Sequence, residues 1–235
     1  MMAAANYQER RKQIENYFDR SAADVWARLT SDEPVSGIRE TVRAGRESMR
    51  NLLLSWLPRD LTGRQVLDAG CGTGVISIEL AKRGADVTAI DLSKSLIDLA
   101  KERYSDIDEY HRIEFIVGDM RQLEGERFDH LIAMDSIIHY AARDGVRTLE
   151  TLAESVDNSM AFTFAPKTLP LAAMHAFGKI FPRADRSPAI EPISPSSLTS
   201  TLLSSSELSD WLIEREHRVS NGFYTSQAME LIRGC

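Results

Sequence analysis

Hydrophobic residues recur along the chain with two different periods, and together they predict alternating strands and helices. Short apolar runs at 66–70, 86–91, 113–117, 128–134 and 160–165 are typical of buried strands. Stretches with helical spacing separate them at 74–83, 94–103 and about 144–156, and Ser93 is the expected N-cap of the second. Strands that alternate with helices of about ten residues favour an α/β fold with a parallel, doubly wound sheet.

Two later segments, 211–219 and 226–233, are predicted to form an antiparallel hairpin with Asn221-Gly222 between them. Between the fifth strand and this hairpin, an insertion at 166–195 holds six of the eight prolines. It follows the carboxyl end of a parallel strand, which is where ligands of such sheets bind. The insertion is therefore interpreted either as a lid over a ligand or as a segment packed on the body of the protein.

The first 57 residues are expected to be mostly helical and to form an arm, with 58–235 as the main domain. Apolar residues from Ile14 to Leu29 follow a 3.6-residue period, and a second helix is predicted from about Gly37 to Leu57 with Ser36 as its N-cap. This second helix carries a basic stripe of Arg39, Arg43, Arg46 and Arg50. The stripe is either a solvated face or a contact for substrate, cofactor or a partner.

The most informative motif runs from Val66 to Gly74 and reads Val-Leu-Asp-Ala-Gly-Cys-Gly-Thr-Gly. A strand, a glycine turn and a helix N-terminus form a cradle in which missing side chains let a ligand approach the backbone. The dinucleotide fingerprint would need a third glycine at position 75, where Val75 stands. The sequence instead resembles motif I of the S-adenosylmethionine-dependent methyltransferases.

Two further acids follow predicted strands. Asp91 comes 23 residues after Asp68, and an acid about 20 residues beyond the glycine turn can accept both ribose hydroxyls. The resemblance implies that Asp119, after the third strand, binds the adenine amino group and that Leu92 and Met120 enclose the ring. For Asp119 alone, a helix cap is the alternative interpretation. The complete predicted cofactor-binding set is Asp68, Gly70, Gly72, Gly74, Asp91, Leu92, Asp119, Met120, Met134 and Arg46, the last for the cofactor carboxylate.

Length, charge and cysteine content limit the possible functions. The chain has 235 residues and 43% hydrophobic content, enough for one well-buried domain with small additions. A net charge of −7 argues against an enzyme that tracks nucleic-acid phosphates. No secretory core or membrane span is visible, so a cytoplasmic enzyme is expected, with peripheral membrane contact left open. Cys71 and Cys235 are expected to be reduced and inert, and no metal site is predicted.

Four segments make the resemblance more specific. They are Asn16 to Arg20, Phe128 to Tyr140, Phe162 to Lys167 together with 181–188, and Gly222 to Ser226. Together they resemble the magnesium-protoporphyrin IX methyltransferases of chlorophyll and bacteriochlorophyll biosynthesis, from about Asn6 to Arg233. The resemblance implies a Rossmann-like class I methyltransferase fold, with a seven-stranded, mostly parallel sheet and an antiparallel last strand. It also implies methyl transfer from S-adenosylmethionine to one propionate of magnesium-protoporphyrin IX, and the large porphyrin-carrying subunit of magnesium chelatase as a partner.

The insertion carries the predicted substrate-binding residues. Its apolar core includes Phe177 and Phe181, which suit a flat porphyrin, and Lys167 and Arg183 could meet the propionates. The alternative for these basic residues is a solvated surface charge. His175 could approach the porphyrin magnesium axially, although a histidine on an apolar helix is more often structural.

The acidity of the acceptor decides which catalytic groups are expected. A propionate resembles glutamate, with a pKa of about 4.3, and is already a nucleophile at neutral pH. Proximity and orientation can supply on the order of 7–11 kcal/mol of the barrier. Attack neutralises both reacting charges, so strong stabilisation of the separated charges would slow it. His139 and Tyr17 are the predicted positioning residues; the alternatives are a loop histidine satisfied by backbone and a packing aromatic.

Three other functions stay open at this point. One is a methyltransferase that acts on a quinone or on another carboxylate. Another is a catalytically silent protein that binds S-adenosylmethionine. A nicotinamide-dependent oxidoreductase is disfavoured by Val75 and by the lack of a second nucleotide-binding half.

Overall fold

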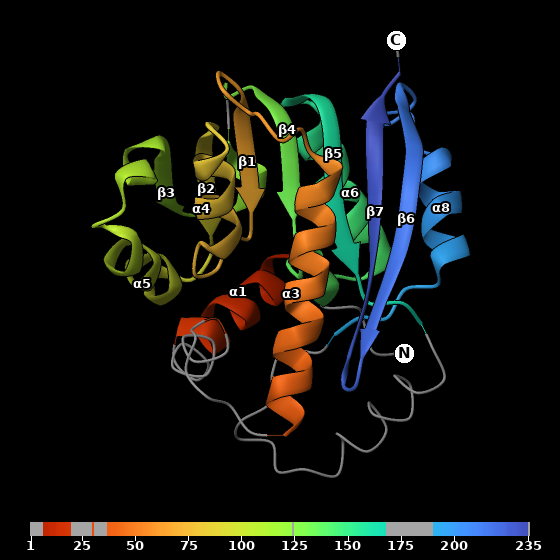
Figure 1. Ribbon diagram of the computed structural model, residues 1–235. Coiled ribbons are helices and arrows are strands. Elements are labelled where there is room, and N and C mark those ends of the chain that lie inside the picture. Colours follow the sequence, from red (N-terminus) through yellow and green to blue (C-terminus); the bar gives the residue numbers. More distant parts are fainter. Residues whose placement is uncertain (1–6, 20–29, 31–36, 124, 168–189, 235) are drawn as a thin grey trace.

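Seven strands form one sheet in the computed structural model, which describes residues 7–19, 30, 37–123, 125–167 and 190–234. The strands are β1 (Gln65–Ala69), β2 (Asp86–Asp91), β3 (Ile113–Val117), β4 (Phe128–Ala133), β5 (Val156–Phe164), β6 (Trp211–Asn221) and β7 (Tyr224–Arg233). Their order is β3-β2-β1-β4-β5-β7-β6, as Figure 1 shows. The first five strands pair in parallel, and β7 runs antiparallel to both β5 and β6. The predicted fold class is therefore confirmed.

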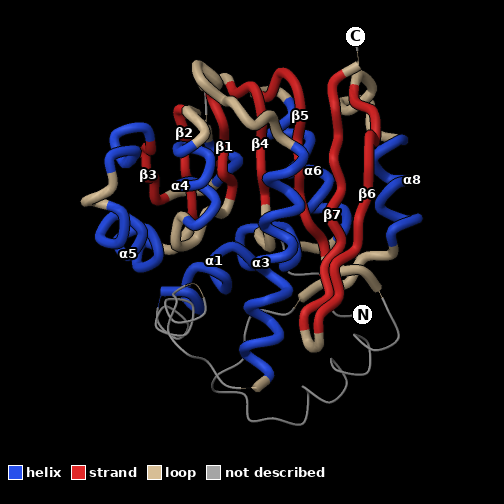
Figure 2. The backbone as a smooth tube through the Cα atoms, viewed as in Figure 1, coloured by secondary structure: helices blue, strands red, loops and turns tan. Residues whose placement is uncertain are grey.

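Helices cover both faces of the sheet (Figure 2). One face packs against α3 (Ile38–Trp56), α4 (Val75–Lys82) and α5 (Lys94–Tyr104), and the other against α6 (Ala142–Ala153) and α8 (Pro195–Leu203). Neighbouring residues of a strand point to opposite faces. Val66 accordingly belongs to the first hydrophobic cluster and Leu67 to the second, both with no exposed surface. This two-sided burial explains why the central strands read as continuous apolar runs.

Short helices complete the described elements. The first helix, α1 (Tyr7–Tyr17), lies across the carboxyl ends of the central strands (Figure 1). Three single turns of 3₁₀ helix, η2 (Asp108–Arg112), η3 (Met120–Gln122) and η4 (Ile137–His139), occur in loops that follow α5, β3 and β4. Two of these loops, after β3 and β4, contain residues that the sequence assigned to the site. Within the described residues, no helix is long and apolar enough to cross a membrane.

Several predicted boundaries were wrong by a few residues. The helix predicted to reach 156 ends at Ala153, and β5 begins at Val156 rather than at 160, because fully buried Val156 pairs with Phe128. Exposed Asp157 and Asn158 interrupt the apolar pattern there and hid the start of the strand. Strand β7 begins at Tyr224, two residues before the predicted start, because Tyr224 pairs with Asn221 across the turn.

Of the two helix N-caps predicted from the sequence, one is confirmed and one is wrong. The Ser93 side chain accepts a hydrogen bond from the backbone N–H of Leu96 at 3.2 Å, which confirms it as the N-cap of α5. Gly37, not Ser36, occupies the N-cap position of α3, and it has a φ of +50°. Glycine adopts this left-handed geometry without a steric penalty, so the helix begins one residue later than a serine cap requires. Ser36 itself lies outside the described residues.

The division into an arm and a main domain stays a prediction, and the insertion is described only at its ends. Pro166 and Ile193 pair in a parallel bridge, and Lys167 donates its backbone N–H to the carbonyl of Ile193 at 2.9 Å. Residues 168–189 lie outside the described part of the chain. The two ends of the insertion are therefore joined directly beside the end of β5.

Candidate active site

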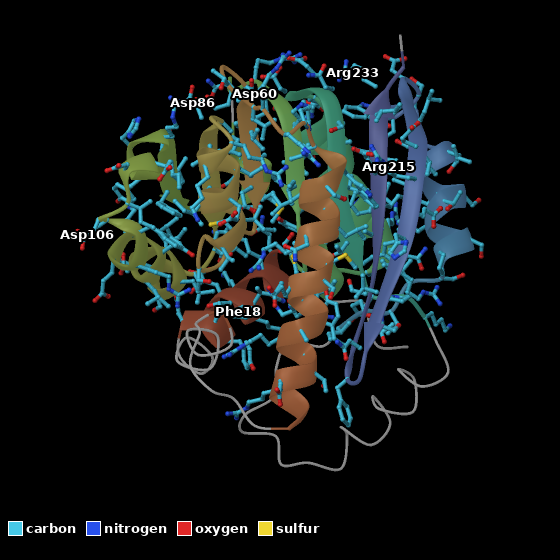
Figure 3. All side chains as sticks on the ribbon, in the orientation of Figure 1. Phe18, Asp60, Asp86, Asp106, Arg215 and Arg233 are labelled. Carbon is cyan, nitrogen blue, oxygen red and sulfur yellow. The ribbon has the colours of Figure 1, made fainter. Side chains whose placement is uncertain are left out.

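A cavity of about 220 Å³ opens where β1, β2 and β4 end. In Figure 3, Phe18 lies below the sheet, on the side where these strands end. Asp60 and Asp86 lie above it, where β1 and β2 begin. The wall comes from α1, α3, the glycine turn and the loops after β2, β3 and β4. The predicted residues that it brings together are Asp68, Gly70, Gly72, Asp91, Leu92, Met120, Met134, Arg46 and His139.

The glycine turn has the geometry that the motif requires. Gly70, Gly72 and Gly74 all have positive φ, at +82°, +54° and +74°. A Cβ on Gly70 would lie 2.3 Å from the Cβ of Ser136, whereas a Cβ on Gly72 would meet no described atom within 4 Å. Gly70 therefore allows close packing, and Gly72 leaves an open wall for a ligand. Gly74 does not line the cavity and instead starts α4, close to the ring of Phe115.

Asp68 lies beneath this turn with 1% of its surface exposed. Its carboxylate accepts a hydrogen bond from the hydroxyl of Ser77 at 2.6 Å. Burial raises the pKa of Asp68 to about 7, against the lowering effect of Ser77, and the nearby charge of Asp91 raises it further. Burial also raises the pKa of the Cys71 thiol well above its ordinary value, so the thiol stays protonated at neutral pH. Cys235 lies outside the described residues.

Asp91 is held by backbone donors at the end of β2. Its two carboxylate oxygens accept from the N–H groups of Gly72 at 2.8 Å and Ser93 at 2.9 Å. Burial raises the pKa of Asp91, and these two hydrogen bonds oppose that effect. The carboxylate is thus fixed between the glycine turn and the start of α5, on the wall of the cavity.

Asp119 is buried beside the cavity, and it has the capping role that was considered as the alternative for it. Its Oδ1 caps η3 through the N–H of Arg121 at 3.0 Å and accepts from the Tyr7 hydroxyl at 2.7 Å. Its Oδ2 is buried and accepts no hydrogen bond from any described residue, although Arg11 Nε lies 3.7 Å away. A buried acceptor without a hydrogen-bond donor requires an explanation, such as a water molecule or a ligand. This orphaned oxygen fits an adenine amino group.

Three arginines of the basic stripe, Arg43, Arg46 and Arg50, line the cavity, while Arg39 is exposed outside it. Arg46 forms an ion pair with Asp135, which directly follows Met134 after β4. The solvated-face interpretation therefore describes only Arg39 among these four residues.

The predicted catalytic residues differ in their placement. His139 ends η4, is 6% exposed and lies on the cavity wall with its ring 6.0 Å from that of Phe18. Tyr17 ends α1 and is not among the residues that line the cavity, whereas its neighbour Phe18 is. The exposed Lys167 is also outside the lining. His175, Phe177, Phe181 and Arg183 lie outside the described residues.

Asp135, on the cavity wall, and Tyr7, beside it, are among the residues that the sequence analysis missed. Asp135 follows a strand end, as Asp91 and Asp119 do, so the same positional argument could have found it. Tyr7 carried no such signal, because its partner Asp119 is 112 residues away. Tyr7 also stacks on Tyr140, with ring centroids 5.1 Å apart.

The strand order, the glycine turn and the acids after β2 and β3 define a class I S-adenosylmethionine-dependent methyltransferase. Family models agree: one described as "Methyltransferase domain" matches residues 66–158, and one described as "Magnesium-protoporphyrin IX methyltransferase C-terminus" matches 133–233. The chain is 46% identical to a magnesium-protoporphyrin O-methyltransferase of Rhodobacter capsulatus, over 96% of this chain and 98% of the relative. The chain belongs to the magnesium-protoporphyrin IX O-methyltransferase family.

Solved structures support the same assignment. The crystal structure of magnesium protoporphyrin IX methyltransferase from Synechocystis with bound SAH matches with a TM-score of 0.83 and 28% identity, over 95% of this chain and 99% of that one. A second structure of the Synechocystis enzyme, with bound SAM, matches with a TM-score of 0.78 and 25% identity over the whole of both chains. The resemblance found in the sequence is confirmed.

Proposed function

We propose that the protein transfers the methyl group of S-adenosylmethionine to a propionate carboxylate of magnesium-protoporphyrin IX. The products are the monomethyl ester and S-adenosylhomocysteine. The observation that carries the proposal is 46% identity to a magnesium-protoporphyrin O-methyltransferase over 96% of the chain. The cavity at the carboxyl edge of the sheet, with its open glycine turn, supports it independently.

S-adenosylmethionine supplies the methyl group, and this chain supplies the groups that hold it. The Asp91 carboxylate, fixed by two backbone donors, faces the cavity and is assigned to the ribose hydroxyls. The orphaned Oδ2 of Asp119 is assigned to the adenine amino group, with Leu92 and Met120 beside the ring. Because Gly72 has no side chain, the ligand can approach the backbone of the turn closely at this position.

The cofactor carboxylate requires a cation on the opposite wall. Arg46 is the predicted partner, and it lines the cavity while paired with Asp135. Arg50, one turn further along α3, is a second candidate, because its Nε is buried and donates no hydrogen bond to a described residue. Met134 and Asp68 complete the proposed cofactor wall, and Gly70 and Gly74 shape it.

The acceptor needs orientation rather than a strong base, because its carboxylate is ionised at neutral pH. His139, buried on the cavity wall, is the proposed positioning residue nearest the end of β4. Tyr17 is a second, placed next to Phe18 at the end of α1. The insertion residues Lys167, His175, Phe177, Phe181 and Arg183 are proposed to bind the porphyrin.

These positioning roles make a sharp prediction. His139→Ala and Tyr17→Phe should each lower turnover by about 10–10³-fold, since orientation supplies much of the rate. The affinity for S-adenosylmethionine, measured by calorimetry, should stay close to that of the wild type. Wild-type turnover in both variants would remove this assignment, and loss of cofactor binding would show that the residues support the donor site instead.

The overall activity is tested with labelled S-adenosylmethionine and magnesium-protoporphyrin IX, followed by chromatography of the pigment. We expect the label to be in the pigment. Alkaline hydrolysis should then release the label as methanol, because a methyl ester is cleaved under these conditions. A quinone and an unrelated aliphatic carboxylate serve as competing acceptors. Transfer to one of these and none to the porphyrin would contradict the proposal, and cofactor binding without any transfer would indicate a silent binding protein.

A finer proposal concerns location and partner. The protein is proposed to work in the cytoplasm, in peripheral contact with membranes, and to receive its substrate from the large porphyrin-binding subunit of magnesium chelatase. Exposed Arg39 on α3 is the candidate docking charge. Arg39→Glu should weaken retention of that subunit in a pull-down, whereas Lys94→Glu, an exposed charge on α5, should not. Unchanged retention by Arg39→Glu would count against this docking surface.

A further inference from the structure

Asp135 occupies a constrained position on the cavity wall. It has a φ of +54°, the one positive value among non-glycine residues in the described part of the chain. Such a backbone costs about 1–3 kcal/mol and persists only where neighbours enforce it. Thr163 does so from β5, because its hydroxyl accepts the N–H of Asp135 at 2.8 Å and donates to Oδ1 at 3.2 Å.

Two further elements hold the Asp135 carboxylate. The Tyr224 hydroxyl, at the start of β7, donates to Oδ1 at 3.2 Å, and Arg46 of α3 pairs with Oδ2. Burial and the Asp135 charge raise the pKa of Tyr224 well above its ordinary value, so this hydroxyl remains a donor. Gly45 permits the arrangement, because a Cβ there would lie 2.6 Å from the Tyr224 ring. The structure thus places the Asp135 carboxylate, with only 6% of its side chain exposed, against a cavity arginine.

The charge of this wall matters for methyl transfer to a carboxylate. The acceptor is anionic before the reaction and becomes a neutral ester. A guanidinium without a counter-charge would therefore stabilise the bound acceptor more than the transition state and would raise the barrier. Arg43, Arg46 and Arg50 line the same cavity, where Arg46 pairs with Asp135 and Arg50 lies 3.6 Å from Glu47, so acids already accompany two of these charges.

We propose that Asp135 is a positioning residue that neutralises Arg46, so that the arginine orients carboxylate groups without trapping the acceptor in its ground state. This role rests on the proposed function, since it concerns an anionic acceptor. Asp135 would then make the enzyme specific for acceptors whose negative charge is lost on methylation.

Asp135→Asn separates charge from shape. Asparagine tolerates left-handed backbone and keeps a carbonyl oxygen that can accept from Thr163 and Tyr224, but it cannot neutralise Arg46. Steady-state kinetics should show kcat falling about 10-fold, while magnesium-protoporphyrin IX binds several-fold more tightly in fluorescence titrations with S-adenosylhomocysteine present. S-adenosylmethionine is kept saturating in the kinetic measurements, because Arg46 is also the proposed partner of the cofactor carboxylate.

A second variant removes the positive charge of Arg46 in addition to the negative charge of Asp135. In the Asp135→Asn background, Arg46→Gln removes the positive charge that Asp135 no longer offsets, and it should restore part of the lost kcat at saturating S-adenosylmethionine. A matched control is Asp129→Asn, because Asp129 lies on β4, the strand that precedes Asp135, and pairs with an arginine, Arg64, at 2.8 Å. Asp129 is outside the cavity lining, so both constants should match the wild type.

The outcomes distinguish failure of the proposed function from failure of the role proposed for Asp135. If the wild type fails to methylate magnesium-protoporphyrin IX, the proposed function falls and this role falls with it. If the wild type is active, the role alone is overturned by any of three results for Asp135→Asn. These are an unchanged kcat, a lower kcat with unchanged or weaker porphyrin binding, and tighter binding of S-adenosylmethionine instead of the porphyrin. Failure of Arg46→Gln to restore kcat overturns it as well.

Discussion

Asp68→Asn should change how the stability of the protein depends on pH. In the folded protein without S-adenosylmethionine, burial raises the pKa of Asp68 to about 7, whereas an unfolded aspartate has a pKa of about 3.9. Between these two values the folded state holds one more proton than the unfolded state, so the free energy of unfolding falls as pH rises. The stabilisation is complete below about pH 4 and lost above about pH 7.

The size of the effect follows from the two pKa values. The protonated carboxyl contributes roughly 3 kcal/mol at pH 5 and almost nothing at pH 8. Asparagine does not titrate and has nearly the same shape. The difference in unfolding free energy between Asp68→Asn and the wild type should therefore move by about 3 kcal/mol in favour of the variant from pH 5 to pH 8.

Urea unfolding of both proteins at pH 5, 6, 7 and 8, without cofactor, measures this shift, and an unchanged m-value shows that the comparison is valid. Asp60→Asn is the control. The backbone N–H of Thr62 lowers the pKa of the exposed Asp60, so that carboxyl stays ionised in both states across this range. A stability difference for Asp68→Asn that is the same at all four pH values would refute the reasoning.

Three further predictions concern the glycines and the adenine site. Gly72→Ala and Gly63→Ala should each lower the free energy of unfolding in urea by about 1 kcal/mol, because both residues have a positive φ and open space around them. Only Gly72→Ala should also weaken S-adenosylmethionine binding, measured by calorimetry. Equal cofactor affinities would show that Gly72 does not face the ligand. Asp119→Asn should raise the dissociation constant of S-adenosylmethionine about 10-fold, because a charged acceptor for the adenine amino group is lost, and an unchanged constant would exclude Asp119 from that role. Gly45→Ala should lower the melting temperature through an overpacking cost of about 1–3 kcal/mol against Tyr224, and an unchanged melting temperature would argue against the close contact.

Local patterns in the sequence predicted most of the fold. The strands buried on both faces are continuous apolar runs, and the alternate glycines after Asp68 all adopt positive φ. Errors occurred where a local pattern was weak. The start of β5 carries two exposed polar residues, Asp157 and Asn158, and α3 begins at Gly37 rather than at the better-known serine cap.

The site was predictable only as far as it follows strand ends. Asp91 and Asp119 lie where the topology places them, after β2 and β3. The Tyr7–Asp119 and Arg46–Asp135 contacts join residues 112 and 89 positions apart, and no local spacing encodes such pairs. Tyr17 illustrates the same limit, because it is the last residue of α1 and the next residue in the chain, Phe18, lines the cavity instead.

The cluster around Asp135 also has a consequence for synthesis of the chain. Its members come from α3, the end of β4, β5 and the start of β7, so that Arg46 and Tyr224 meet on one carboxylate. The five parallel strands precede Tyr224 in the sequence, so a growing polypeptide can contain all of them before it contains the tyrosine that closes this cluster. The hydrogen bonds that fix Asp135 are therefore completed late in synthesis, when β7 pairs with β5.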